Sequence, residues 1–136
     1  MIDKEIIKIA SNTENHGVLN NHTHSAKLKN AICGDVMKIY LIVEKDKIAN
    51  FKYQCESCIY CQASVSLLSR IIKNKLVEKV KSFAQQADGY FDKNVNSFGK
   101  EWKEFDKIMT KNNISRRECL LLPINTMLDA LSKKIL

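Results

Sequence analysis

Five cysteines provide the residues of this sequence that could bind a metal or carry sulfur. Cys55, Cys58 and Cys61 follow one another at intervals of three residues, whereas Cys33 and Cys119 lie far away in the chain. Cysteines at that interval can place their thiolates close enough to share one soft metal ion. An odd number of cysteines cannot form a closed set of disulfides, so these residues favour metal or sulfur chemistry in a reducing compartment.

Asp35 adds a carboxylate two residues after Cys33. Three thiolates and one carboxylate suit a tetrahedral zinc ion or a soft iron site, whereas calcium or magnesium would require oxygen ligands. A carboxylate also makes a more exchangeable site than a fourth thiolate would, which suits a ligand that must leave and react. Our hypothesis is that the fold brings Cys33, Asp35 and Cys119 up to Cys58.

Three strands are predicted over residues 26–29, 37–43 and 48–53, where apolar and polar residues alternate. They should form an antiparallel meander, with one apolar face that must be buried by other elements. The connection before the second strand contains Cys33 and Asp35, and Cys58 follows the third strand. Antiparallel neighbours place the start of the second strand beside the end of the third, so the three residues should meet.

Apolar residues at helical spacing predict helices over residues 3–10 and 101–109, and a helical region from Ala63 with a possible break at Asn74. These helices supply the cover that the sheet needs. The predicted fold class is α+β, a three-stranded antiparallel sheet covered by helices on one face. No internal repeat or linker divides the chain, so we expect a single domain over residues 1–136.

A last helix is predicted to follow Ser115, which would form a capping box with Glu118. Pro123 would then lie near the start of this helix, where proline is tolerated. Cys119 would also lie near the helix N-terminus, a position that lowers the pKa of a thiol.

The formal net charge is +7, but the lysines are spread along the chain and no arginine-rich arm is present. We therefore expect no nucleic-acid partner. The longest apolar runs, such as residues 39–43, are far too short to span a membrane, so we expect no membrane partner. The first residues do not have the pattern of a signal peptide, which favours a cytoplasmic protein.

Three short motifs surround the separate cysteines. They are N-A-I-C-G-D at residues 30–35, C-I-Y-C-Q-A-S-V-S at residues 58–66 and R-R-E-C at residues 116–119. Together they resemble the three cysteine motifs of the IscU/SufU/NifU N-terminal family of iron–sulfur cluster assembly proteins. The resemblance begins near residue 16 and reaches the C-terminal helix, so it covers nearly the whole chain.

Within this family the sequence is most like the SufU branch. The long segment between Cys58 and Cys119 looks like the SufU insertion, here around residues 85–105. Glu118 stands where scaffold-type IscU proteins carry a histidine, and Arg116 matches a basic residue that SufU proteins keep. Because Arg116 lies beside the last cysteine, it is a candidate for contact with the partner or with the transferred sulfur.

In the SufU branch the resemblance implies zinc held by Cys33, Asp35, Cys58 and Cys119. It also implies that a pyridoxal-phosphate cysteine desulfurase docks and that one zinc ligand is displaced. Cys33 then accepts the persulfide sulfur, so the protein acts as a zinc-dependent sulfurtransferase that supplies a downstream iron–sulfur scaffold or apo-acceptor protein. The chemistry is attack of a thiolate on a persulfide sulfur.

Two alternatives stay open. The chain could be a scaffold on which iron and sulfide form a [2Fe–2S] cluster, held by Cys33, Cys58 and Cys119 with Asp35, before the cluster is passed on. It could also be a purely structural zinc module that binds partner proteins.

The sequence departs from the family pattern at a few positions. Ala31 replaces a proline, and Cys55 and Ser57 replace two glycines before the second cysteine motif. If either glycine position requires a positive φ, the backbone must bend differently here. Cys55 and Cys61 could be extra ligands or redox thiols, or they could be small, partly buried apolar residues.

Overall fold

The computed structural model describes residues 4–91 and 98–132 of the chain. Four α-helices and three strands form most of this part, together with two 3₁₀ helices. In chain order the elements are α1 (Lys4–Ala10), β1 (His24–Lys29), β2 (Val36–Glu44), β3 (Lys47–Glu56), α2 (Ile59–Ile71), α3 (Val77–Asp88), η1 (Lys100–Lys107), η2 (Lys111–Arg116) and α4 (Arg117–Leu131).

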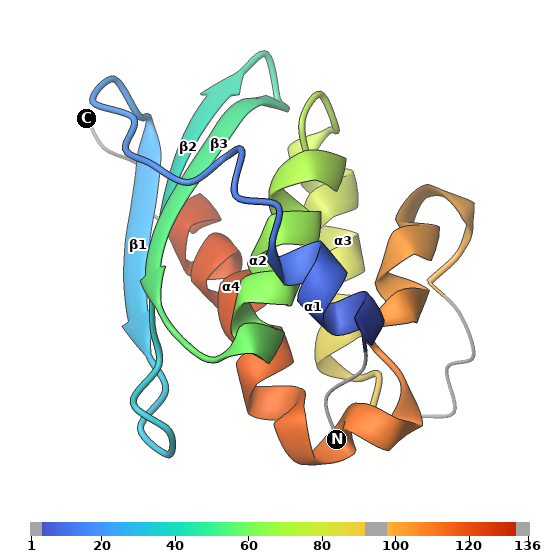
Figure 1. Ribbon diagram of the computed structural model, residues 1–136. Helices are drawn as coiled ribbons and strands as arrows, with labels where there is room; N and C mark the ends of the chain where they lie inside the picture. Colours follow the sequence, from blue (N-terminus) through green and yellow to red (C-terminus); the bar gives the residue numbers. More distant parts are fainter. Residues whose placement is uncertain (1–3, 92–97, 133–136) are drawn as a thin grey trace.

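The sheet has the order β1-β2-β3 with both pairs antiparallel, and the helices lie on one of its faces (Figure 1). Helix α4 packs on β1 and β2, and α2 packs on β3. Residues Met37, Ile39 and Leu41 of β2 point to these helices and are completely buried. The predicted α+β fold is therefore confirmed, and the alternation of β2 sets which face is covered.

The hairpin between β2 and β3 turns on Lys45 and Asp46, which both have positive φ, of 52° and 64°. Two central residues with positive φ define a type I′ turn, whose twist matches that of the flanking strands. The usual Asn-Gly signal is missing here, so the sequence pays a conformational cost at this turn. Each strand is longer than predicted, and β3 continues through Cys55 to Glu56.

The helices differ from the predictions in detail. Helix α2 begins at Ile59, before the predicted start at Ala63. The predicted break at Asn74 is confirmed, because this residue has a φ of 69° between α2 and α3. Residues 101–109 were predicted as a helix, but the structure has the 3₁₀ helix η1 there, with a kink at Trp102.

The start of α4 corrects two predictions. Helix α4 begins at Arg117, and Ser115 lies in the preceding 3₁₀ helix η2, so the capping box with Glu118 does not form. Pro123 lies inside α4 and not at its start. A proline inside a helix has no N–H for the carbonyl four residues earlier, which is that of Cys119.

The predicted inserted segment is held by an aromatic cluster. The ring of Phe83 in α3 stacks on Trp102 at 4.3 Å and also contacts Phe98 and Phe105. All four rings are buried, which confirms the predicted packing role of Trp102. Residues 92–97, which belong to the predicted insertion around residues 85–105, lie outside the described part of the chain.

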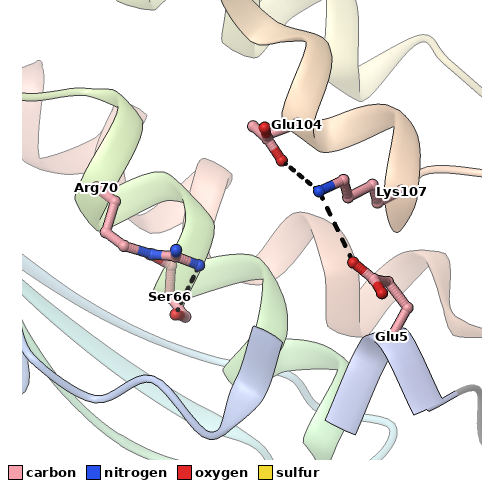
Figure 2. Close-up of polar contacts among 5 residues, drawn as sticks. All are labelled: Glu5, Ser66, Arg70, Glu104 and Lys107. Carbon is pink, nitrogen blue, oxygen red and sulfur yellow. Dashed lines mark hydrogen bonds and ion pairs between the residues drawn. The ribbon is translucent and has the colours of Figure 1, made fainter. Parts of the chain in front are cut away.

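Polar contacts at the surface join the N-terminal helix to this segment (Figure 2). The Nζ of Lys107 lies 2.8 Å from a carboxylate oxygen of Glu104 and 3.7 Å from one of Glu5 in α1. These side chains are about half exposed, so solvent screens the ion pairs and they add little to stability. Within residues 4–91 and 98–132, no helix has both the length and the apolar character that a membrane span requires.

Replacing Asp46 by glycine should raise the free energy of unfolding by about 1 kcal/mol, because glycine adopts a positive φ without the cost that an L side chain incurs. Urea unfolding measures this change. The control is Lys47→Gly at the first position of β3, where glycine weakens the strand and should lower stability. A loss of stability in Asp46→Gly would contradict the type I′ assignment.

Candidate metal centre

Three separate segments meet at one end of the sheet (Figure 1). They are the connection between β1 and β2 at residues 30–35, the residues that lead into α2, and the first turn of α4. The register pairs Val36 with Glu56, so the start of β2 lies beside the end of β3 as predicted. The fold thereby brings Asp35, the residues before α2 and the first turn of α4 close to the loop that contains Cys33.

The connection between the first two strands is a closed turn built around Asn30. The backbone N–H of Asn30 donates to the carbonyl of Asp35 at 2.8 Å, and that of Gly34 donates to the carbonyl of Asn30 at 2.8 Å. The side-chain oxygen of Asn30 also accepts the N–H of Ile32 at 3.0 Å. Gly34 has a φ of 76°, which glycine tolerates best, and it sets the relative positions of Cys33 and Asp35.

This turn places two of the predicted ligands against the first turn of α4. The Sγ atoms of Cys33 and Cys119 lie 3.9 Å apart. The ligand atoms of Cys33, Asp35 and Cys119 all lie within 4.8 Å of one another. The Sγ atom of Cys58 does not belong to this group. Cys58 is nevertheless adjacent, because its backbone N–H donates to Oδ1 of Asp35 at 3.2 Å and its side chain contributes to the raised pKa of Cys119.

The carboxylate of Asp35 is buried, with 7% of its surface exposed. Its Oδ1 atom accepts the bond from Cys58, but Oδ2 is buried with no hydrogen-bond partner in the described structure. A buried carboxylate oxygen without a partner is costly, and a cation would remove that cost. With the neighbouring thiols, the donor set fits zinc or iron and does not fit calcium or magnesium.

The predicted lowering of the Cys119 pKa is wrong. Burial raises the pKa of this thiol well above its usual range, and the neighbouring Cys58 and Cys33 add to the increase. A thiolate at this position would be poorly solvated and close to other thiols that can carry negative charge, which outweighs the helix N-terminus. Binding of a metal cation would reverse this balance, because coordinated thiols are deprotonated.

A buried hydrogen bond holds α2 and α4 together next to Cys119. The hydroxyl of Ser64 donates to the carbonyl of Leu120 at 2.6 Å, and neither residue has exposed surface. The sequence analysis did not assign a role to Ser64. The available signal was its position in an apolar helix, where a buried hydroxyl needs a partner.

Arg116 directly precedes α4, makes no side-chain capping hydrogen bond and is exposed. Its guanidinium lies 5.2 Å from the centre of the Tyr60 ring, in the first turn of α2, which is within the range of a cation–π contact. The contact joins the two helices that carry Cys58 and Cys119. Whether Arg116 also contacts a partner or the sulfur stays a prediction.

The two extra cysteines differ from each other in exposure. Cys61 is completely buried in α2, and Cys55 is partly buried in β3 opposite Met37. Burial raises the pKa of both thiols, while the nearby Ser57 hydroxyl acts in the opposite direction. Neither Cys55 nor Ser57 has a positive φ, so β3 and its exit accommodate them without glycine.

Comparison with known proteins gives one match to a family. The sequence model described as the NifU-like N terminal domain matches residues 1–98. The iron–sulfur cluster assembly scaffold protein IscU of Thermotoga maritima is 29% identical over 133 residues, which cover 98% of this chain and 94% of that protein. The zinc-dependent sulfurtransferase SufU of Bacillus subtilis is 30% identical over 74 residues, which cover 54% of this chain and 50% of that protein.

Solved structures support the fold. A NifU-like protein (N-terminal) from Brucella abortus superposes with a TM-score of 0.88 at 18% identity, over 96% of this chain and 91% of that chain. A SufU protein from Fervidobacterium islandicum AW-1 gives a TM-score of 0.83 at 24% identity, over 96% of both chains.

In the metal-free protein, Cys33 should react first with iodoacetamide and Cys61 should react last, only when the chain unfolds. The thiol of Cys33 is exposed, whereas that of Cys61 is buried and has a raised pKa, so it presents little thiolate to the reagent. Mass spectrometry of the peptides over time measures the order. The control is the same reaction in urea, where all cysteines should react alike. Rapid labelling of Cys61 in the folded protein would contradict its place in the core.

Proposed function

This chain belongs to the family of NifU-like N-terminal domains, and we propose that it is a zinc-dependent sulfurtransferase of iron–sulfur cluster assembly. The observation that carries the proposal is the exposed thiol of Cys33 beside the buried Asp35 and Cys119. In this proposal residues 1–136 act as one cytoplasmic domain. Its partners are a pyridoxal-phosphate cysteine desulfurase and a downstream scaffold or apo-acceptor protein.

The proposed zinc ligands are Cys33, Asp35, Cys58 and Cys119. The unpartnered, buried Oδ2 of Asp35 supports this set, because a carboxylate at that position needs a positive group. When bound, zinc would keep the coordinating thiols deprotonated at neutral pH. Asp35 is the weakest of the four donors and makes the site exchangeable.

The ligands differ in their access to a protein partner, and this difference assigns their roles. Cys33 is exposed, Cys58 is partly buried, and Cys119 is buried in the first turn of α4. The donor sulfur of another protein can therefore reach Cys33 most directly. Cys58 and Cys119 would hold the site together while Cys33 reacts.

The proposed reaction is a transfer of sulfane sulfur. The Cys33 thiolate attacks the terminal sulfur of a cysteine persulfide on the desulfurase, and a new S–S bond forms at Cys33. The S–S bond of the donor breaks, and its cysteine leaves as a thiolate. The reaction exchanges one persulfide for another, so it needs no external oxidant or reductant.

A second candidate is the cluster scaffold. It is supported by the similarity to the Thermotoga maritima IscU scaffold over 98% of this chain. Iron and sulfide would then be the substrates, and Cys33, Cys58, Cys119 and Asp35 would hold the [2Fe–2S] product until it passes to an apo-acceptor.

The cysteine turnover of the cognate desulfurase should rise at least about tenfold with wild-type protein and should not rise with Cys33→Ala, because the acceptor thiolate is lost. Sulfide release measures turnover, and elemental analysis measures zinc. The matched control is Cys61→Ala, which removes a buried thiol outside the proposed ligand set. Unchanged turnover with zinc-loaded wild-type protein would exclude the sulfurtransferase. A stable cluster after anaerobic addition of iron and sulfide would then favour the scaffold.

Gly34→Ala should weaken zinc binding by up to about tenfold. Alanine at a φ of 76° costs about 1–2 kcal/mol, and the exposed turn can relax when zinc is absent, so zinc must restore the strained form. A competition titration with a chelating dye measures the affinity. Gly99→Ala is the control, because Gly99 has a φ of 84°, also with open space for a Cβ, but lies outside the ligand set. Equal affinities in both variants would show that the turn does not position the ligands.

A further inference from the structure

Ile32 is the most exposed large apolar side chain among the described residues. Its exposed fraction is 85%, while the next, Ile114, reaches 49%. Single exposed apolar residues are common on protein surfaces and carry no meaning by themselves. Ile32 differs because it directly precedes Cys33, the exposed thiol of the proposed metal centre.

Hydrogen bonds shape the turn that presents Ile32. Its N–H donates to the side chain of Asn30, and the turn is closed by the bonds between Asn30, Gly34 and Asp35. The apolar side chain is therefore presented to solvent on an ordered turn. Such preorganisation lowers the entropic cost of binding.

A hollow beside Ile32 extends this apolar surface. Leu28 of β1 and Leu122 of α4 line it together with Ala31, and Lys29 and Glu118 provide polar groups. The surface thus has an apolar centre with charged residues of both signs, which is the composition of a small protein-docking site. Because this docking surface lies next to Cys33, we expect its occupant to be a protein that reacts with Cys33.

Reaction at Cys33 requires a donor sulfur to approach this thiol closely, since an S–S bond is about 2.05 Å long. The Cα atoms of consecutive residues are only about 3.8 Å apart, so a protein that delivers sulfur to Cys33 comes close to the exposed side chain of Ile32. We propose that Ile32, with the hollow formed by Leu28 and Leu122, is the contact by which the sulfur-donor protein recognises this chain. This inference rests on the proposed function, and it specifies a donor surface with an apolar pocket next to its persulfide-bearing segment.

The test replaces Ile32 by aspartate and uses Ile7→Asp as the matched control, because Ile7 is also exposed, at 48%, but lies in α1. Three quantities are measured for wild type and both variants. They are the concentration that half-maximally stimulates the cognate desulfurase, the equilibrium constant for binding that desulfurase, and the rate at which Cys33 accepts sulfur from glutathione persulfide. Zinc content and circular dichroism report folding.

Ile32→Asp should raise both the half-maximal concentration and the dissociation constant at least about tenfold, as expected for an apolar anchor at the centre of an interface. Its reaction with glutathione persulfide and its zinc content should stay at the wild-type values, and Ile7→Asp should resemble wild type throughout. Wild-type affinity in Ile32→Asp would overturn the docking contact and leave the proposed function intact. Loss of both protein and glutathione persulfide reactions would also overturn it, because Ile32 would then shape the thiol site itself.

Failure of the proposed function gives a different pattern. Wild-type Cys33 would then accept no sulfur from the desulfurase or from glutathione persulfide, whether or not the desulfurase binds. A tenfold weaker binding of the desulfurase to Ile32→Asp would in that case retain the docking contact without sulfur transfer. Absence of desulfurase binding to wild type would overturn the inference.

Discussion

The buried carboxylate of Asp35 is the constraint on which the site depends. The antiparallel register of β2 and β3 brings this residue to the entrance of α2, where Oδ1 accepts the N–H of Cys58. That bond satisfies one carboxylate oxygen and leaves Oδ2 buried without a partner in the described structure. A buried carboxylate oxygen without a partner is costly, and a bound cation would remove that cost. With the neighbouring thiols of Cys33 and Cys119, the donor set would fit a soft cation better than an alkaline earth ion.

The three thiols around Asp35 are placed on elements of different rigidity. Cys119 is buried in α4, whose first turns are tied to α2 by the bond from Ser64 to Leu120. Cys33 lies on a turn that contacts solvent. A ligand on a buried helix loses its position only at the cost of core packing, whereas a ligand on an exposed turn can be displaced without disturbing the core. The geometry therefore favours a site that opens at Cys33 and stays intact elsewhere.

The alternation of β2 and the order of the strands were enough to predict that the start of β2 lies beside the end of β3, which places Asp35 next to the backbone of Cys58. The position of Cys119 could not be predicted in the same way, since no local pattern specifies how a distant helix packs on a sheet. Its geometry was expected from the cysteine motifs, and its raised pKa could not be predicted, because burial depends on the tertiary contacts. The capping box failed for a similar reason, as η2 occupies the residues where a cap would form.

Exposure of Ile32 could not be predicted either, because composition gives a lone isoleucine in a turn no preference between core and solvent. Ile32 is exposed because of the hydrogen bonds that Asn30 makes. These bonds turn the chain so that Asp35 points inward. Burying Asp35 and exposing Cys33 uses the tight bend at Gly34, and the residue before Cys33 then has no core to enter. The exposed isoleucine is thus a consequence of the same turn that brings the proposed metal ligands together. The proposed partner contact and the proposed metal ligands Cys33 and Asp35 therefore lie on one short segment of backbone.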